Sequence, residues 1–115
     1  TSEQVVNYLA FSADWVRNRL QAHPKNLLLI EAVGDSMVPT FSDSDLLLVD
    51  LGEPQFKHDG IYVLLRDNDL SIRRIQRQPD GNLLIRSDNR VYDPYIVRSD
   101  ALRVIGRVIW AGRRL

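Results

Sequence analysis

Residues 26–51, NLLLIEAVGDSMVPTFSDSDLLLVDL, decide the fold of this chain. Two apolar runs, 26–33 and 45–51, have the length of buried strands and are short for helices. Residues 34–44 between them are rich in Gly, Ser, Asp and Pro, which favours a turn over regular structure. The stretch therefore predicts a buried strand, a turn that begins at Gly34 and carries Ser36, and a second buried strand.

The sequence after residue 51 continues as short strands and turns. Apolar or alternating runs fall at residues 61–66, 70–77, 83–86, 95–98 and 104–110. The turn sequences 67–69 (DND) and 78–82 (QPDGN) join the first three runs as hairpins. These runs predict a mainly β fold, either a rolled antiparallel sheet or a barrel.

The first 22 residues predict helix. Apolar residues recur there at four-residue spacing, as Val5 with Leu9 and Val16 with Leu20. Ser12 is placed to cap the second segment, and Pro24 pushes the preceding residue out of helical geometry. We therefore divide the chain into a helical lead-in, residues 1–25, and a β domain, residues 26–115, which form one compact domain.

Composition excludes several classes of protein. The chain has 115 residues, 44% of them hydrophobic and none of them cysteine. This length fits one domain, and the lack of cysteine excludes a disulfide framework, a zinc ribbon and a thiol nucleophile. The sequence shows neither an apolar run of bilayer length nor an export signal. We therefore expect a cytoplasmic protein that does not contact a membrane.

Charge is distributed unevenly although the net charge is zero. Residues 1–65 hold 4 basic and 9 acidic side chains, and residues 66–115 hold 11 basic and 6 acidic ones. A basic half is compatible with nucleic-acid binding. The arginines are dispersed among acidic and apolar residues, however, so an internal or intersubunit dipole is the favoured interpretation.

Several motifs together resemble the LexA-type self-cleaving repressors and related phage repressors, a family that also resembles signal peptidases. The motifs are Gly34-Asp35-Ser36-Met37 with Pro39, residues 45–50 (DLLLVD), 59–63 (DGIYV), 70–75 (LSIRRI), Ser87-Asp88-Asn89 with Tyr92, and 105–110 (IGRVIW). They cover about residues 27–110, and their order and intervals make the resemblance specific. The resemblance implies the LexA-like β fold of the C-terminal domain.

The resemblance also implies a serine–lysine dyad, in which a neutral lysine takes the proton of a nucleophilic serine. Ser36 matches the nucleophile. The turn residues Gly34, Asp35, Met37 and Pro39 match the cleft around it, where successive backbone N–H groups can form an oxyanion hole.

The lysine of the dyad is replaced in this sequence. Its position falls on Arg73, 37 residues after Ser36. A guanidinium keeps its proton far above neutral pH and does not accept a further one in proteins. We therefore expect little or no peptidase activity. Arg73 can instead donate a hydrogen bond to Ser36 or hold a peptide carbonyl or carboxylate in the cleft.

Two points about the base stay open at this stage. Strand alternation alone allows either Arg73 or Arg74 to face the cleft, and both can also be ordinary exposed sheet residues. Lys57 and His58 precede a strand, and a serine–histidine pair is chemically reasonable because histidine titrates near neutral pH. Lys25 is the only other lysine and does not fall at the family's position.

We expect neither a metal nor a cofactor. His23 and His58 are 35 residues apart and have no cysteine to complete a site. Asp43 and Asp45 could be ligands of a calcium ion, but the sequence pattern of a calcium-binding loop is missing. We therefore predict that both are acidic residues of a surface turn.

The function implied by the resemblance is that of a C-terminal regulatory and dimerisation domain in a helix-turn-helix transcriptional repressor. We expect a homodimer, operator DNA bound through an N-terminal domain that this chain lacks, and a peptide or inducer protein as a possible occupant of the cleft. Neither dipeptide that self-cleaving relatives cut, Ala-Gly or Cys-Gly, precedes Ser36, which agrees with a chain that does not cleave itself. The interface candidates lie on the last strand: Val104, Val108 and Trp110, of which Trp110 also fits the core.

Two alternative functions remain. The intact turn around Ser36 favours an active self-cleaving peptidase with another base. The basic C-terminal half favours a nucleic-acid-binding domain.

Overall fold

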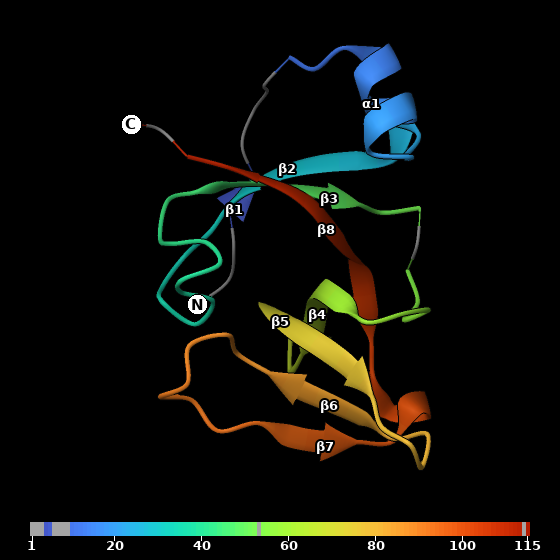
Figure 1. Cartoon of the computed structure of the whole chain (residues 1–115), viewed down its shortest axis with the longest axis vertical. Helices are drawn as coiled ribbons and strands as arrows, with labels where there is room; N and C mark the ends of the chain where they lie inside the picture. The colour runs from blue at the N-terminus through green and yellow to red at the C-terminus, as the bar shows by residue number, and fades with distance from the viewer. Residues whose placement is uncertain (1–3, 6–9, 53, 114) are drawn as a thin grey trace.

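The computed structural model describes residues 4–5, 10–52, 54–113 and 115, and its main element is one open antiparallel sheet (Figure 1). The strands in the described residues are β1 (Gln4–Val5), β2 (Leu27–Glu31), β3 (Leu46–Asp50), β4 (Gly60–Arg66), β5 (Asp69–Arg77), β6 (Leu83–Arg86), β7 (Tyr95–Val97) and β8 (Val104–Gly112). Their order in the sheet is β1-β2-β3-β8-β4-β5-β6-β7. Because β1 and β7 form two separate edges, the sheet is rolled and does not close into a barrel.

Seven of these strands lie where the sequence predicts them, to within two residues at each end. The predicted hairpins are confirmed, since β4 pairs with β5 and β5 pairs with β6. Asp67 and Asn68 have positive φ angles of 51° and 67°, which suit a two-residue hairpin turn.

The helix predicted over the first 22 residues is confirmed in its second segment and wrong at residues 4–5. The described part holds one α-helix, α1 (Ala13–Arg19), whose N-cap Ser12 accepts a hydrogen bond from the Trp15 amide at 3.3 Å as predicted. Val5 instead lies in β1, opposite Ile30 of β2. Pairing with the free edge of β2 satisfies backbone groups, and this tertiary contact outweighs the helical spacing. Leu9 lies outside the described residues.

Strand β8 joins the two halves of the sheet. Its C-terminal part pairs with β3 and its N-terminal part pairs with β4, so in Figure 1 it runs between the upper and lower strands. Gly106 sits at this crossing, where an added Cβ would lie 2.6 Å from the carbonyl oxygen of Asp50. The close approach of β8 to β3 therefore requires glycine at this position.

Two hydrophobic clusters lie on opposite faces of β4, because alternate residues of a strand point to opposite sides. Ile61 and Val63 contact the first cluster, whereas Tyr62 and Leu64 belong to the second. The buried members of the first are Ile30, Ala32, Met37, Phe41, Leu47, Val49, Val63 and Ile72. Those of the second are Tyr62, Leu64, Ile75, Leu83, Ile85 and Val104.

The three residues predicted for a dimer interface pack within the chain itself. Val104 is only 8% exposed in the second cluster, and Val108 packs against the first. Trp110 makes edge contacts with the rings of Phe11 and Trp15, at centroid distances of 5.2 and 6.4 Å. Val104 therefore has almost no surface to offer a partner, and Trp110 joins α1 to the sheet.

The short helical pieces complete the described fold. They are two 3-10 helices, η1 (Pro24–Asn26) and η2 (Ser99–Ala101). No helix within the described residues is long and apolar enough to span a bilayer.

Candidate functional site

The turn between β2 and β3 places Ser36 beside a buried anchor. Met37 is 2% exposed and belongs to the first hydrophobic cluster, so the segment is fixed immediately after the serine. Gly34 has a φ of 88°, a backbone conformation that glycine adopts without strain, and its amide donates to Asp43 Oδ1 at 2.7 Å. The amide of Val38 donates to the carbonyl oxygen of Asp35 at 3.3 Å, which closes the turn around Ser36.

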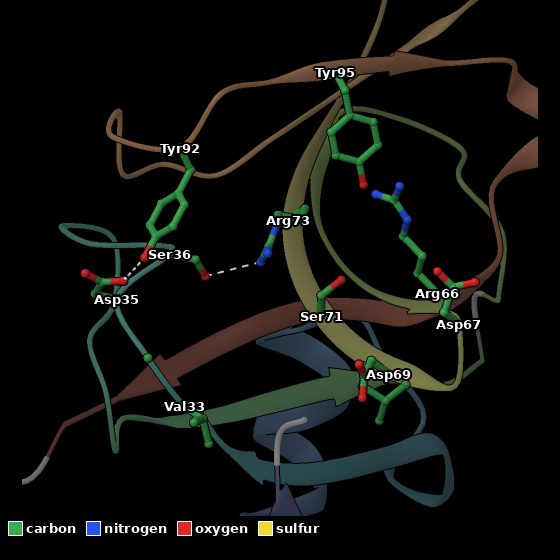
Figure 2. Close-up of a pocket in the computed structure, with 12 residues that line it drawn as sticks. Val33, Asp35, Ser36, Arg66, Asp67, Asp69, Ser71, Arg73, Tyr92 and Tyr95 are labelled. Atoms are coloured by element: carbon green, nitrogen blue, oxygen red, sulfur yellow. Dashed lines mark hydrogen bonds between the residues drawn. The ribbon is translucent and has the colours of Figure 1, made fainter. Parts of the chain in front are cut away.

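Arg73 of β5 lies against Ser36 (Figure 2). Its Nη1 atom donates to Ser36 Oγ at 3.2 Å and to the carbonyl oxygen of Ile72 at 2.6 Å. The predicted hydrogen bond between Arg73 and Ser36 is thus confirmed.

The neighbouring Arg74 has a different partner. Its Nε and Nη2 atoms each lie 2.8 Å from a carboxylate oxygen of Asp88. This ion pair holds the pKa of Asp88 below its ordinary range, and Thr40 donates a further hydrogen bond to the same carboxylate. Strand alternation allowed either arginine to face the cleft. In the structure Arg73 contacts the serine, whereas Arg74 does not line the same cavity.

The loop between β6 and β7, residues 87–94, holds the Ser36 turn in place. The Asn89 amide donates to the carbonyl oxygen of Ser36 at 3.0 Å, and its side-chain Nδ2 donates to that of Asp35 at 3.0 Å. The Tyr92 hydroxyl donates to Asp35 Oδ1 at 2.6 Å, and this hydrogen bond raises the pKa of Tyr92. Sequence reasoning included Asn89 and Tyr92 among the family motifs but assigned them no role.

A polar cavity of about 430 Å³ opens beside the serine. Figure 2 shows Ser36 and Arg73 at one end and Arg66, Asp67 and Tyr95 at the other, with Ser71 between them. The Arg66 guanidinium lies 5.0 Å from the centroid of the Tyr95 ring. The remaining lining residues are Val33, Gly34, Asp35, Asp69, Leu70 and Tyr92.

The structure excludes two of the residues expected to donate backbone N–H groups to an oxyanion hole. The amide of Gly34 is engaged by Asp43, and Pro39 has no N–H and lines a different hollow. Within the described ranges, the amides of Ser36 and Met37 donate no backbone hydrogen bond inside the chain. The amide of Asp35 donates none in this part of the described chain either, so the N–H groups of these three residues are available to bind a carbonyl oxygen or an anion.

The other candidate bases lie elsewhere. His58 and Lys57 are exposed and do not line the cavity, and the backbone oxygen of His58 accepts from the Tyr62 hydroxyl at 2.6 Å. His23 caps η1 by accepting from the amide of Lys25 at 3.1 Å. Among the residues that the structure describes, no cluster of His, Cys, Asp or Glu could hold a metal ion.

The prediction that Asp45 is a surface-turn acid is wrong. Asp45 is 6% exposed and pairs with Arg113, whose Nη2 lies 3.0 Å from Oδ2. The pKa of Asp45 is lowered by this hydrogen bond and by the Ser42 amide. The C-terminal Arg113, 68 residues away, supplies the partner that made burial possible, and local sequence gave no sign of it.

One Ala-Gly pair does occur in the chain, at Ala111-Gly112. It follows Ser36 in sequence and lies at the end of β8, where it pairs with Leu47 and Leu46 of β3. Strand pairing holds it in the sheet, away from the cavity lining.

The chemistry available at the cavity follows from its donors. Arg73 offers only N–H groups, so it cannot take a proton from Ser36. The lining combines two guanidinium groups, three carboxylates and several hydroxyls, which is the composition of a polar binding site.

Comparison with known proteins gives one family and several relatives. The family described as Peptidase S24-like matches residues 1–109. An uncharacterised HTH-type transcriptional regulator of Haemophilus influenzae is 28% identical over 106 residues, which cover 90% of this chain and 44% of that protein. The repressor protein CI of Enterobacteria phage phi80 is 33% identical over 84 residues, covering 73% of this chain and 36% of that protein.

A LexA repressor of Clostridium novyi is 26% identical over 91 residues, which cover 78% of this chain and 44% of that repressor. The chain thus spans less than half the length of each of these three relatives.

Proposed function

The chain belongs to the Peptidase S24-like family, and from this premise we propose that it is the regulatory domain of a helix-turn-helix transcriptional repressor that does not cleave itself. The names of its relatives, an HTH-type transcriptional regulator, a phage CI repressor and a LexA repressor, support the repressor part of this proposal.

The observation that carries the absence of self-cleavage is the contact between Ser36 and Arg73. A serine hydroxyl becomes nucleophilic when a neighbouring base takes its proton. Here the neighbour at 3.2 Å is a guanidinium that donates to Oγ and stays charged. Losing the general base typically lowers the rate of catalysis about 10²–10⁴-fold. Ser36 is therefore present but is not activated as a nucleophile.

The regulatory role proposed for the domain is to pair two copies of the repressor on DNA. A dimer with two-fold symmetry would place two DNA-binding domains on the two halves of a palindromic operator. The half-buried aromatic cluster of Phe11, Trp15 and Trp110, where α1 meets β8, is the candidate contact. Sedimentation velocity at micromolar concentration tests this: a dimer is expected, and a chain that stays at the 13.2 kDa monomer contradicts it.

Self-cleavage is tested on the full-length repressor that contains this domain. Intact mass is measured after prolonged alkaline incubation for the wild type and for Arg73→Lys, Ser36→Ala and the double variant. We expect the wild type to remain whole and Arg73→Lys to gain cleavage that Ser36→Ala abolishes. Cleavage of the wild type that disappears in Ser36→Ala would overturn the proposal.

The second candidate function is an active peptidase. The amides of Ser36 and Met37 favour it, because they donate no backbone hydrogen bond within the described residues and are available for an oxyanion hole. It requires a base other than Arg73. The same incubation separates the two functions, since wild-type cleavage dependent on Ser36 is expected only for the second.

A further inference from the structure

A second hollow, of about 510 Å³, lies beside the loop of residues 87–94, outside the cavity that holds Ser36. It is lined by three arginines and by apolar rings: Pro39, Thr40, Arg74, Arg86, Ser87, Asp88, Arg90, Tyr92 and Pro94. Only one carboxylate, that of Asp88, stands among the three guanidinium groups. The lining therefore carries a net charge of about two positive units.

Without a bound partner, the positive charge of this hollow destabilises the folded chain. Arg74 and Arg86 lie directly opposite each other on β5 and β6, and like charges in that arrangement destabilise a sheet. Asp88 binds Arg74 through both of its oxygens and also interacts electrostatically with Arg86. Arg86 and Arg90 form no ion pair within the described part of the chain.

Two other arginines of the described chain form ion pairs. Arg98 pairs with Asp100 at 2.8 Å, and Arg113 pairs with Asp45 at 3.0 Å. Arg66 lies over the ring of Tyr95. Arg86 and Arg90, which form no ion pair within the described residues, line one hollow together, and an occupant with negative charge would complement them.

The walls of the hollow also offer apolar contacts. Tyr92, Pro39 and Pro94 contribute rings to it. Close by, on the edge strand β7, Ile96 is 60% exposed and lies opposite Leu84, two residues from Arg86 on the same face of β6. Val91, in the same loop, is 78% exposed. An occupant with apolar side chains as well as acids would match this surface.

From this arrangement we infer that the hollow binds an acidic segment of a partner protein, with carboxylates on Arg86 and Arg90 and an apolar side chain against Tyr92 and Pro94. Arginine binds carboxylates through paired N–H donors, which gives both affinity and orientation. Nucleic acid fits less well, because its binding rests on several phosphates contacted along a basic stripe. The positive charge here is confined to one hollow.

This site lies next to the turn that carries Ser36. Tyr92 lines both hollows, and the loop that carries Arg90 also carries Asn89, which is bonded to Ser36. In Figure 1 this loop, between β6 and β7, extends toward the turn between β2 and β3. A partner on Arg86 and Arg90 would therefore contact the segment that holds the turn. The inference does not depend on whether Ser36 is active.

Fluorescence anisotropy with the whole chain tests the inference. The probes are a labelled synthetic peptide of alternating glutamate and leucine, the same peptide with glutamine in place of glutamate, and a labelled single-stranded oligonucleotide of similar length. The variants are Arg86→Gln with Arg90→Gln, and a control with the same charge change, Arg98→Gln with Arg103→Gln. The unfolding midpoint of each variant is measured to show that it is folded.

We expect the wild type to bind the glutamate peptide and not the glutamine peptide. Affinity should fall at least about tenfold in the Arg86/Arg90 variant, since hydrogen bonds to charged groups are the strong ones. The control should change it less than about twofold. Absence of peptide binding, equal loss in both variants, or tighter binding of the oligonucleotide that depends on Arg86 and Arg90 would each overturn the inference.

Discussion

Arg73 Nη1 lies 3.2 Å from Ser36 Oγ, a contact between residues 37 positions apart in the chain. The same nitrogen donates to the carbonyl oxygen of Ile72 at 2.6 Å, which fixes the guanidinium at the edge of the cavity. The serine is thus presented on a well-anchored turn, while its neighbour is a donor that cannot act as a base. Predictions about the turn and its supports follow from this arrangement.

Replacing Met37 should loosen the anchor of the serine turn. Met37→Ala removes a side chain that is 2% exposed in the first cluster, and such changes typically lower the free energy of unfolding by about 2–5 kcal/mol. Met37→Leu keeps the volume and should lower it by less than about 1.5 kcal/mol. Urea unfolding measures both. Equal small effects would show that the turn does not depend on this anchor.

Asn89 should stabilise the turn through its side chain. Asn89→Ala removes two hydrogen bonds, one from Nδ2 to the Asp35 carbonyl oxygen and one that Oδ1 accepts from the Val91 amide, each worth about 1 kcal/mol of unfolding free energy. Asn82→Ala is the matched control, since the Asn82 side chain donates to Asp80 within the same exposed hairpin. We expect a change below about 0.5 kcal/mol there. A control effect as large as that of Asn89→Ala would contradict the role given to the loop.

Stability should fall in acid because of the Arg74–Asp88 pair. The hydrogen bond from Arg74 lowers the pKa of Asp88 in the folded state, so the folded chain holds a proton there less tightly than the unfolded chain. The stabilisation is complete above the ordinary aspartate value of about 3.9 and is lost as the pH falls through the lowered folded value.

Unfolding free energy measured between about pH 2 and pH 6 tests this contribution. Asp88→Asn should flatten the decline in acid relative to the wild type. Asp100→Asn, in an exposed ion pair with Arg98, should leave the profile nearly unchanged. A wild-type profile that Asp88→Asn leaves unaltered would contradict the importance of the pair.

Most strands could be predicted from the sequence because their apolar runs are bounded by strong turn residues. β1 could not, since Val5 pairs with Ile30 by filling an open sheet edge, and the local spacing resembled a helix. The direction of Arg73 could not be derived from alternation either. Ile72 and Ile75 lie in different clusters, so both faces of β5 are buried and neither is marked as the polar one.

The contacts that hold the site in place could not be predicted from short stretches of sequence either. Asn89 and Tyr92 reach the serine turn from 53 or more residues away, and Arg113 reaches Asp45 across 68 residues. These contacts depend on how the strands are ordered in the sheet, which no short motif encodes. The turn that carries Ser36 was predictable, because a Gly-started turn between two apolar runs is visible in the sequence. The match of Ser36 to a nucleophile rests on the resemblance to the LexA-type family.

The central claim, that Ser36 is present but not activated, is tested most directly by labelling this chain with a fluorophosphonate probe and locating the label by mass spectrometry. Wild type, Arg73→Lys and Ser36→Ala are compared as the pH is raised from about 7 to about 10, the range in which a partly buried lysine loses its proton. We predict no label on wild-type Ser36, and label on Ser36 in Arg73→Lys that increases with pH. Rapid labelling of wild-type Ser36 that is absent from Ser36→Ala would contradict the account.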